Sequence, residues 1–164
     1  MLLSKKKNLI PLPTLHYSIS PEHSDFPGTI VIDEKTLLKF LNQIYHSLKS
    51  FGLKELTILN CHGGNHTALD KLGKGFRVIN IWRLIPHNHF EHAGELETSL
   101  MLALMPSNVN LNKATKGKFL DKKIKNIRVA DYSKSGVMGD ATKASKAKGR
   151  KLLSTLLKKL QQLI

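Results

Sequence analysis

The chain of 164 residues contains one cysteine, Cys61, and no long hydrophobic run. A single cysteine excludes an intrachain disulfide framework and fits a reducing cytoplasm, where we expect the protein to reside. The absence of an apolar run of about 20 residues excludes a membrane-spanning helix, and the first residues lack the long apolar region of a signal peptide. We therefore expect a soluble, unsecreted protein.

Acidic and aromatic residues are also scarce. The chain has 12 Asp and Glu residues against 26 Lys and Arg residues, a formal net charge of +14, and only 6% aromatic residues. A strongly basic chain suggests a nucleic-acid partner. The lysines are dispersed, however, and they are not interleaved with aromatic residues as in single-strand binders. We expect a lysine-rich surface and keep nucleic-acid binding as an alternative.

The length and the 41% hydrophobic content suit one ordinary domain with its own core, so we expect a single domain over residues 1–164. Predicted helices and strands alternate along the chain, in the order helix from Asp33 to about Gly52, strand 55–59, short helix after Asn65, and strand 76–82. This alternation predicts an α/β fold with a parallel sheet and right-handed crossovers.

The stretch Leu59-Asn60-Cys61-His62-Gly63-Gly64-Asn65-His66 has the form of a ligand-binding loop. It follows a short apolar strand, and open α/β sheets bind ligands at the carboxyl ends of their strands. His62 therefore lies where an imidazole can bind a ligand, and the two glycines let the backbone turn sharply and approach that ligand. Asn65 is a good N-cap for the next helix.

A second group of titratable residues follows the strand 76–82. Four acidic or imidazole groups fall between His89 and Glu95, and Glu97 stands in the first turn of a predicted helix that ends before Pro106. The helix dipole favours carboxylates at a helix start whatever their function. Glu97 lies next to the apolar stripe of that helix, however, where a carboxylate needs a cation or strong hydrogen-bond donors.

The remaining segments carry weaker signals. Residues 16–30 predict a polar loop that is either a solvated surface or the wall of a site. A weak strand is expected over 122–130. The last helix carries an apolar stripe opposite its lysines, with Asp140 and Thr142 as candidate caps. The stripe indicates core packing, with contact to an anionic membrane surface as a minor alternative.

Three segments of the chain carry motifs that occur together in one enzyme family: Asn60-Cys61-His62-Gly63-Gly64-Asn65, His92-Ala93-Gly94-Glu95-Leu96-Glu97-Thr98-Ser99 and Ser135-Gly136-Val137-Met138-Gly139-Asp140. With the loop Glu22-His23-Ser24-Asp25-Phe26-Pro27-Gly28-Thr29, they resemble the creatininase family of metal-dependent amidohydrolases. The resemblance implies a three-layer α/β/α fold around a mostly parallel sheet.

The resemblance also implies an activity: hydrolysis of a non-peptide C–N bond, in a small cyclic or formyl amide, by water bound to divalent zinc, manganese or iron. His62 would be a metal ligand, His92 a proton shuttle or substrate-orienting residue, and Glu97 a support for the metal or its water. A divalent ion lowers the pKa of bound water, and an imidazole can pass a proton to the leaving nitrogen. The loop residues expected to contact substrate are Gly63, Gly64, Asn65 and Glu95.

The chain departs from the family pattern in its metal ligands. Family members carry a Glu-x-His pair and a Thr-Asp upstream of the segment that begins at Glu22, and this chain begins too late to contain them, so we expect an N-terminally truncated form of the fold. Gly64 stands where creatininase itself has a carboxylate ligand. A single imidazole does not hold a catalytic metal, because such ions usually have about three protein ligands.

Three hypotheses about these missing ligands stay open. The chain is part of a split enzyme completed by a complementary N-terminal chain, or an inactive homologue acting as a subunit or binding protein, or a protein that binds metal through substitutes such as His23, Glu22 or His89. A missing first strand would also leave an open sheet edge, which predicts a homo-oligomer or pairing with the complementary chain.

Overall fold

The computed structural model describes residues 9–85, 91–119 and 127–164. The chain divides into two compact units, one formed by Pro13–Leu84 and the other built mainly from Ile85–Ile164. A single domain over residues 1–164 stays a prediction.

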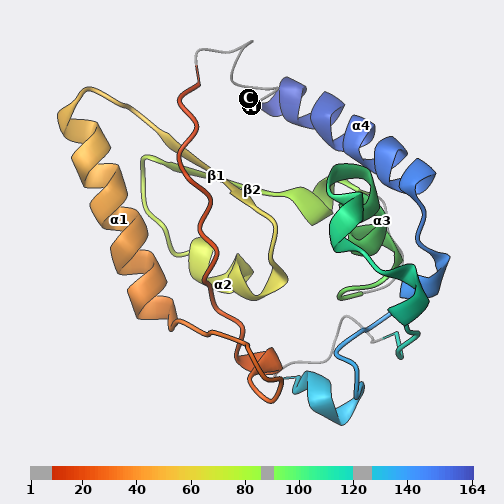
Figure 1. Ribbon diagram of the computed structural model, residues 1–164. Helices are drawn as coiled ribbons and strands as arrows, with labels where there is room; N and C mark the ends of the chain where they lie inside the picture. The colour runs from red at the N-terminus through yellow and green to blue at the C-terminus, as the bar shows by residue number, and fades with distance from the viewer. Residues whose placement is uncertain (1–8, 86–90, 120–126) are drawn as a thin grey trace. The chain divides into compact units, whose positions relative to one another are not determined.

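The unit Pro13–Leu84 contains a parallel pair of strands, β1 (Leu56–Asn60) and β2 (Phe76–Asn80). Leu56 lies opposite Phe76, and Asn60 lies opposite Asn80, so the two strands end at the same edge (Figure 1). The connection between them contains the short helix α2 (His66–Leu69). Parallel strands joined through a helix confirm the predicted α/β class.

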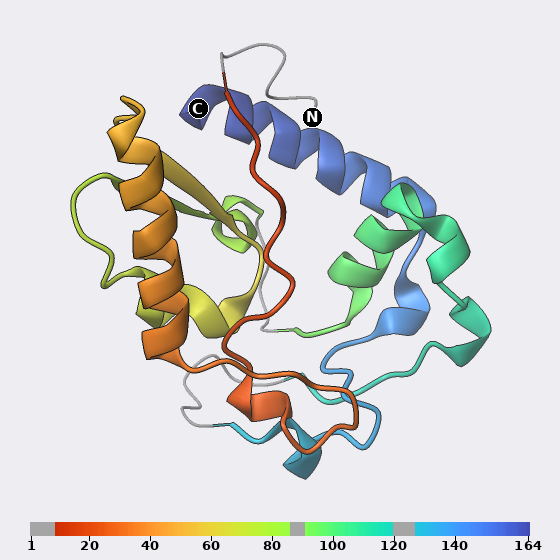
Figure 2. The same ribbon diagram turned by 60° about the vertical axis from the view of Figure 1, so that its left-hand side comes forward.

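Helix α1 (Glu34–Ser50) lies beside this strand pair in both ribbon views (Figure 2). It begins as predicted at Asp33, whose side chain accepts a hydrogen bond of 2.8 Å from the backbone N–H of Thr36. The core of the unit forms around the buried Leu37, Leu41 and Leu69, against which partly buried apolar residues pack: Ile19, Ile32, Ile58, Leu72, Phe76 and Val78. The apolar spacing of α1 therefore seats it on the strands that carry the site.

The other unit contains helices α3 (Glu95–Leu104) and α4 (Lys146–Leu163). The two helices are in close contact at Gly149 of α4. A Cβ atom at this position would collide with the carbonyl oxygen of Ser99 on α3. Leu156 and Leu160 of α4 are buried. The predicted apolar stripe of the last helix thus serves core packing.

The predicted caps of α4 are wrong. Ser145 is the N-cap, and its hydroxyl accepts from the backbone N–H of Lys148. Asp140 instead caps the separate 3₁₀ turn Ala141–Lys143, where its carboxylate accepts from the N–H and hydroxyl of Thr142. The turn follows Asp140 directly and α4 begins only after it, so the carboxylate of Asp140 accepts hydrogen bonds from the turn and not from the helix.

Two strand predictions need correction. The second strand ends at Asn80 rather than at residue 82, because Ile81–Leu84 forms a 3₁₀ turn. The strand expected over 122–130 lies mostly in 120–126, outside the described residues, and Val129–Asp131 forms a 3₁₀ turn. Within the described ranges, no helix is both long enough and apolar enough to cross a membrane.

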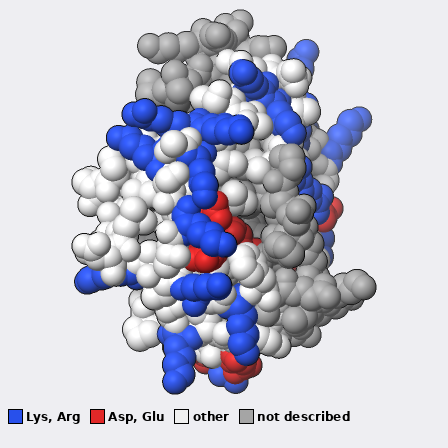
Figure 3. All heavy atoms as spheres, turned by 90° about the vertical axis from the view of Figure 1, so that its right-hand side faces the viewer, with Lys and Arg blue, Asp and Glu red and all other residues white. Residues whose placement is uncertain are grey.

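The lysine-rich surface is visible in Figure 3. Lys and Arg side chains spread over the face drawn there, with acidic side chains at its centre and near its edges. Nucleic-acid binding stays an untested alternative.

Candidate functional site

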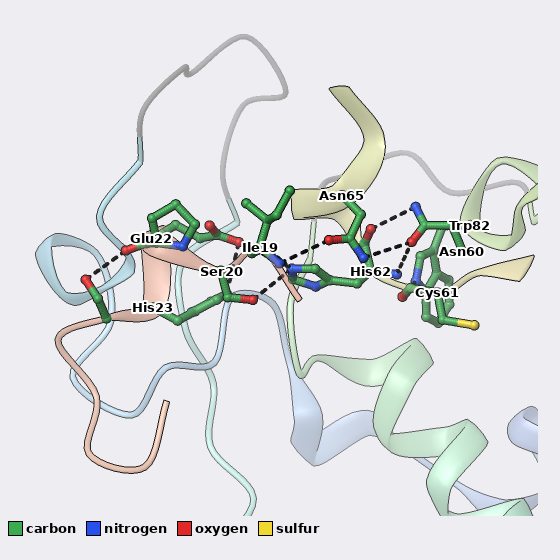
Figure 4. Close-up of polar contacts among 11 residues, drawn as sticks. Ile19, Ser20, Glu22, His23, Asn60, Cys61, His62, Asn65 and Trp82 are labelled. Carbon is green, nitrogen blue, oxygen red and sulfur yellow. Dashed lines mark hydrogen bonds and ion pairs between the residues drawn. The ribbon is translucent and has the colours of Figure 1, made fainter. Parts of the chain in front are cut away.

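The best-defined polar site surrounds His62, which follows β1 and precedes the 3₁₀ turn Gly63–Asn65. Its Nε2 atom lies 2.8 Å from the carbonyl oxygen of Ile19, 2.9 Å from Ser20 Oγ and 3.8 Å from Glu22 Oε1 (Figure 4). A carbonyl, a hydroxyl and a carboxylate thus gather around one ring nitrogen. This half-buried group is the centre of the candidate site.

Gly64 makes this close approach possible. A Cβ atom at position 64 would collide with the carbonyl oxygen of Ile19, and it would lie 2.6 Å from His62 Nε2 and 3.2 Å from Glu22 Oε1. The absence of a side chain therefore lets the segment 19–22 lie against His62. The close approach observed at Gly64 is to another part of the chain, and the predicted approach to a ligand stays a prediction.

Asn65 does not cap α2 with its side chain, which corrects the prediction. Its Oδ1 accepts a hydrogen bond of 3.2 Å from the backbone N–H of Ile19, and its Nδ2 lies 3.3 Å from Asn60 Oδ1. The amide thus joins the segment before the site to the end of β1. The side chain of Asn65 therefore bonds to a residue far away in the sequence instead of to the N–H groups at the start of α2.

Two buried asparagines fix the backbone at His62. Asn60 Nδ2 donates to Asn80 Oδ1 at 2.7 Å and to the carbonyl of His62 at 2.9 Å, while Asn60 Oδ1 accepts from the N–H of His62 at 3.3 Å. The sequence interpretation missed this pair. The available signal was that one asparagine directly follows the first predicted strand, 55–59, and another lies near the end of the second, 76–82.

His66 lies four residues after His62 and stays neutral more readily than an ordinary histidine. Burial and, after it, the charge of Arg83 lower the pKa of His66, with a smaller contribution from His62, and Asp70 opposes them. Its Nε2 is buried and has no hydrogen-bond partner in the structure. The neutral form of His66 is therefore favoured more than in a free histidine.

The other unit holds His92 in a braced turn. The backbone N–H of His92 donates to the carbonyl of Met138, and the N–H of Met138 donates back, both at 2.8 Å. Ala93, the next residue, has a positive φ of 50°. Glu97 accepts from the N–H of Ala93, so the carboxylate holds the strained residue that follows His92.

Glu91 braces the same turn from its other end. Its Oε1 accepts from the N–H of Leu96 at 2.7 Å, and a Cβ atom at Gly94 would lie 2.9 Å from its Oε2. Burial raises the pKa of Glu91, and the nearby charges of Glu97 and Glu95 add to this shift. The sequence interpretation named Glu91 only within a cluster; its position directly before His92 was the signal.

Glu95, predicted in a substrate-contacting loop, pairs with Lys148 Nζ at 2.6 Å on the surface of its own unit. The structure brings together Gly63, Gly64 and Asn65 around His62 in one unit. His92, Glu95 and Glu97 gather at the start of α3 in the other. Convergence of these two groups on one active site stays a prediction.

The site around His62 fits a metal ion only in a restricted way. Across residues 9–85, 91–119 and 127–164, no group of three or more His, Cys, Asp or Glu side chains could hold a metal ion. The neighbours of His62 Nε2 supply one carboxylate, from Glu22, and two neutral oxygens. This donor set suits one ion with mainly oxygen ligands rather than a centre of three side-chain ligands from the usual zinc set.

Comparison with known proteins identifies relatives that match most of the chain. The family model described as "Creatininase: Creatinine amidohydrolase" matches residues 2–164. A "Mycofactocin precursor peptide peptidase" of Mycobacterium tuberculosis strain H37Rv is 29% identical over 160 residues, which cover 88% of this chain and 61% of the relative. A "Creatinine amidohydrolase" of Pseudomonas putida is 27% identical over 178 residues, covering 87% and 68%. The chain thus spans about three fifths of the length of the peptidase relative.

Solved structures show the same fold. The structure "Creatininase Mn" superposes with a TM-score of 0.83 at 23% identity, covering 99% of this chain and 77% of that one. A mutant creatininase of "Zn-Zn type" gives a TM-score of 0.82 at 23% identity with the same coverage. The predicted fold class is therefore confirmed.

Proposed function

The chain belongs to the creatininase family, and from this premise we propose that it forms the metal-binding and proton-transferring part of an amidohydrolase. The observation that carries the proposal is the position of His62 Nε2, which lies just beyond the end of β1 among the oxygens of Ile19, Ser20 and Glu22. A divalent ion held there would supply activated water. Because related creatininases carry manganese or zinc, we propose one of these metals.

His92 is proposed to pass a proton to the leaving nitrogen of the amide. An imidazole can both accept and donate a proton near neutral pH. The pair of backbone hydrogen bonds to Met138 fixes the main chain of His92, and the carboxylates of Glu91 and Glu97 hold the turn around it. Glu97 would act through this turn, and its support of a metal-bound water is a further part of the proposal.

The proposed substrate is a small cyclic or formyl amide. A peptide is the second candidate, favoured by the 29% identity to a relative named as a peptide peptidase. Both substrates present a carbonyl carbon bonded to nitrogen, so the same water attack and the same proton transfer to nitrogen serve either. The proposed setting is the cytoplasm, in keeping with a single, exposed cysteine.

An inactive subunit is the competing function. The observation that favours it is that the described part of the chain offers no group of three acidic, histidine or cysteine ligands. In that case a complementary chain would carry the catalysis. If the chain is active instead, we propose that a second copy of it or a complementary chain supplies the further metal ligands.

Metal analysis together with an amide-hydrolysis assay tests the proposed function. We expect about one manganese or zinc ion per chain in the purified protein, hydrolysis of a cyclic, formyl or peptide amide, and loss of both on chelation or in His62→Ala. The control is His46→Ala, which removes an exposed histidine of α1. Retained metal in His62→Ala would overturn the proposed ligand, and metal without turnover of any of the three amide classes would favour the inactive subunit.

A further inference from the structure

We propose that the solvent-exposed side of α4, which we call the α4 basic face, binds the phosphate backbone of double-stranded DNA. The inference goes beyond the proposed amidohydrolase, since it concerns a surface that takes no part in the hydrolysis. The face consists of the exposed Lys and Arg side chains of the helix: Lys146, Lys148, Arg150, Lys151, Lys158 and Lys159. The sequence of α4 contains no Asp or Glu residue to balance them.

The positive charge of the chain is concentrated in its last part. Residues 98–164 contain 15 Lys and Arg residues against 3 Asp and Glu residues, which accounts for +12 of the net charge of +14. Residues 1–97 contain 11 Lys and Arg residues against 9 Asp and Glu residues. The lysines are dispersed along the chain, but the acidic residues are not. Such an asymmetry between the two parts of a chain indicates a polyanionic partner.

The packing of α4 leaves the α4 basic face open to solvent. Gly149 lies against α3, and Leu156 and Leu160 are buried. At about 100° per residue these three positions share one side of the helix, and the basic side chains occupy the remaining arc of about 220°. Both ribbon views show α4 on the outside of its unit, along α3 (Figures 1 and 2). A long partner can therefore approach the face without disturbing the core.

Few carboxylates neutralise this face. Glu95 pairs with Lys148 Nζ at 2.6 Å. The members that form no ion pair within the described residues are Lys146, Arg150, Lys151 and Lys158. Like charges four residues apart destabilise a helix, and cations in its first turn oppose its dipole. The stability of the free protein therefore does not explain this arrangement, which indicates that it serves binding.

The residue types of α4 favour a nucleic acid duplex over other polyanions. Between the cations lie the exposed polar side chains of Ser154, Gln161 and Gln162, which are suited to hydrogen bonds with phosphate oxygens. The helix contains no aromatic residue on which the bases of a single strand could stack. Its apolar stripe packs in the core, whereas a helix at a membrane surface turns that stripe toward the lipid.

The dimensions of the α4 basic face suit B-form DNA. From Lys146 to Lys159 the face is about 20 Å long at about 1.5 Å per residue, a length over which one DNA strand presents about six phosphates. The major groove of B-DNA is about 12 Å wide and admits an α-helix. Because the cations cover more than half of the circumference of α4, they can reach the phosphates on both sides of that groove. The major groove of duplex RNA is too narrow for this arrangement.

The test measures binding of the full chain to a fluorescein-labelled DNA duplex of about 20 base pairs by fluorescence anisotropy. With about four phosphate contacts, the affinity should fall about 150-fold between about 50 and 200 mM salt, a logarithmic slope of about −3.6. Lys151→Gln combined with Lys158→Gln should weaken binding at least about tenfold at the lower salt concentration and make the slope shallower by about 1.8. Both substitutions lie on the solvent side of α4.

The matched control is Lys35→Gln combined with Lys39→Gln, which removes the same charge from exposed positions of α1 in the other unit and should change the affinity less than about twofold. Lys151→Arg combined with Lys158→Arg keeps the charge and should bind as the wild type does. Circular dichroism checks that α4 stays helical in each variant.

Three results would overturn the inference. The first is an equal loss of affinity in the two glutamine double variants, because net charge alone would then drive the binding. The second is equal or tighter binding of duplex RNA or of single-stranded DNA of the same length. The third is binding to vesicles of phosphatidylcholine and phosphatidylserine without binding to the DNA duplex, which would assign the face to a membrane surface. None of these results depends on amide hydrolysis, so the inference and the proposed function fail separately.

Discussion

Asn60 and Asn80, which end the two parallel strands at paired positions, are joined by a side-chain hydrogen bond of 2.7 Å. Both residues are buried. Since Asn60 also binds both backbone groups of His62, the bond links the end of the second strand to the candidate metal ligand.

Asn60→Ala should therefore destabilise the protein and loosen His62. It leaves the buried amide of Asn80 and the backbone of His62 without their partners, which costs about 1–3 kcal/mol in the free energy of unfolding. Urea denaturation measures this loss, and Mn²⁺ titration should show weaker binding. Asn42→Ala, which removes an amide from the side of α1, should change stability by less than about 0.5 kcal/mol. Equal effects of the two substitutions would contradict the assigned role.

Gly64→Ala should displace the segment 19–22. The new methyl group meets the carbonyl oxygen of Ile19, a main-chain atom that cannot rotate away, so we expect a loss of about 1–3 kcal/mol in stability. Gly63→Ala is the matched control, because a Cβ at position 63 has no neighbour within 4 Å. Thermal unfolding of both variants checks the prediction, which fails if Gly64→Ala is as stable as Gly63→Ala.

Because of Glu91, the protein should become less stable as the pH rises above the ordinary pKa of a glutamate. Its pKa is raised in the folded state, so the folded state binds more protons than the unfolded state between the ordinary and the raised pKa, and stability falls as the pH increases through that window. Glu91→Gln keeps an oxygen for the N–H of Leu96 and should remove this fall. Unfolding free energies from pH 4 to 8 test it, with the exposed Glu55→Gln as control. A parallel pH profile for Glu91→Gln and wild type would refute the assignment.

Titration of His66 should give the stability a pH dependence of the opposite sign. Its pKa is lowered by burial and Arg83, so below pH 6.5 the unfolded state takes up the proton first and stability falls as the pH decreases toward the folded pKa. His66→Leu removes this titration together with the unpartnered Nε2. We expect a flatter stability profile between pH 5 and 7, while His46→Leu, at an exposed position, should leave the slope unchanged. Identical slopes for wild type and His66→Leu would contradict the prediction.

Local patterns predicted the elements that local forces determine. The spacing of Leu37 and Leu41 and the capping oxygen of Asp33 give α1 its position and start, and the apolar run after residue 55 gives β1. The His62 loop could also be placed, because it follows a strand that its own composition identifies.

Contacts between residues that lie far apart in the sequence could not be predicted from it. Ser20 and His62 are 42 residues apart, and Ile19 and Asn65 are 46 apart, so no spacing rule relates them. The same reason explains the error at Asn65. Asparagine is a good helix cap, but here its side chain accepts a hydrogen bond from the backbone N–H of Ile19 instead. The sequence left the loop of Glu22 open between a solvated surface and the wall of a site, and only the fold shows its carboxylate within 4 Å of His62.

The contact between Ile19 and His62 has a consequence for how this protein can vary over evolution. Because the oxygen that meets the imidazole belongs to the main chain, any residue at position 19 preserves it, and selection on the contact acts elsewhere. It acts on Gly64, which must remain without a side chain, and on Asn65, which positions the segment. The identity of residue 19 is therefore constrained by packing of its side chain against the core and not by the contact with His62, whereas a side chain at position 64 would change the geometry of His62 directly.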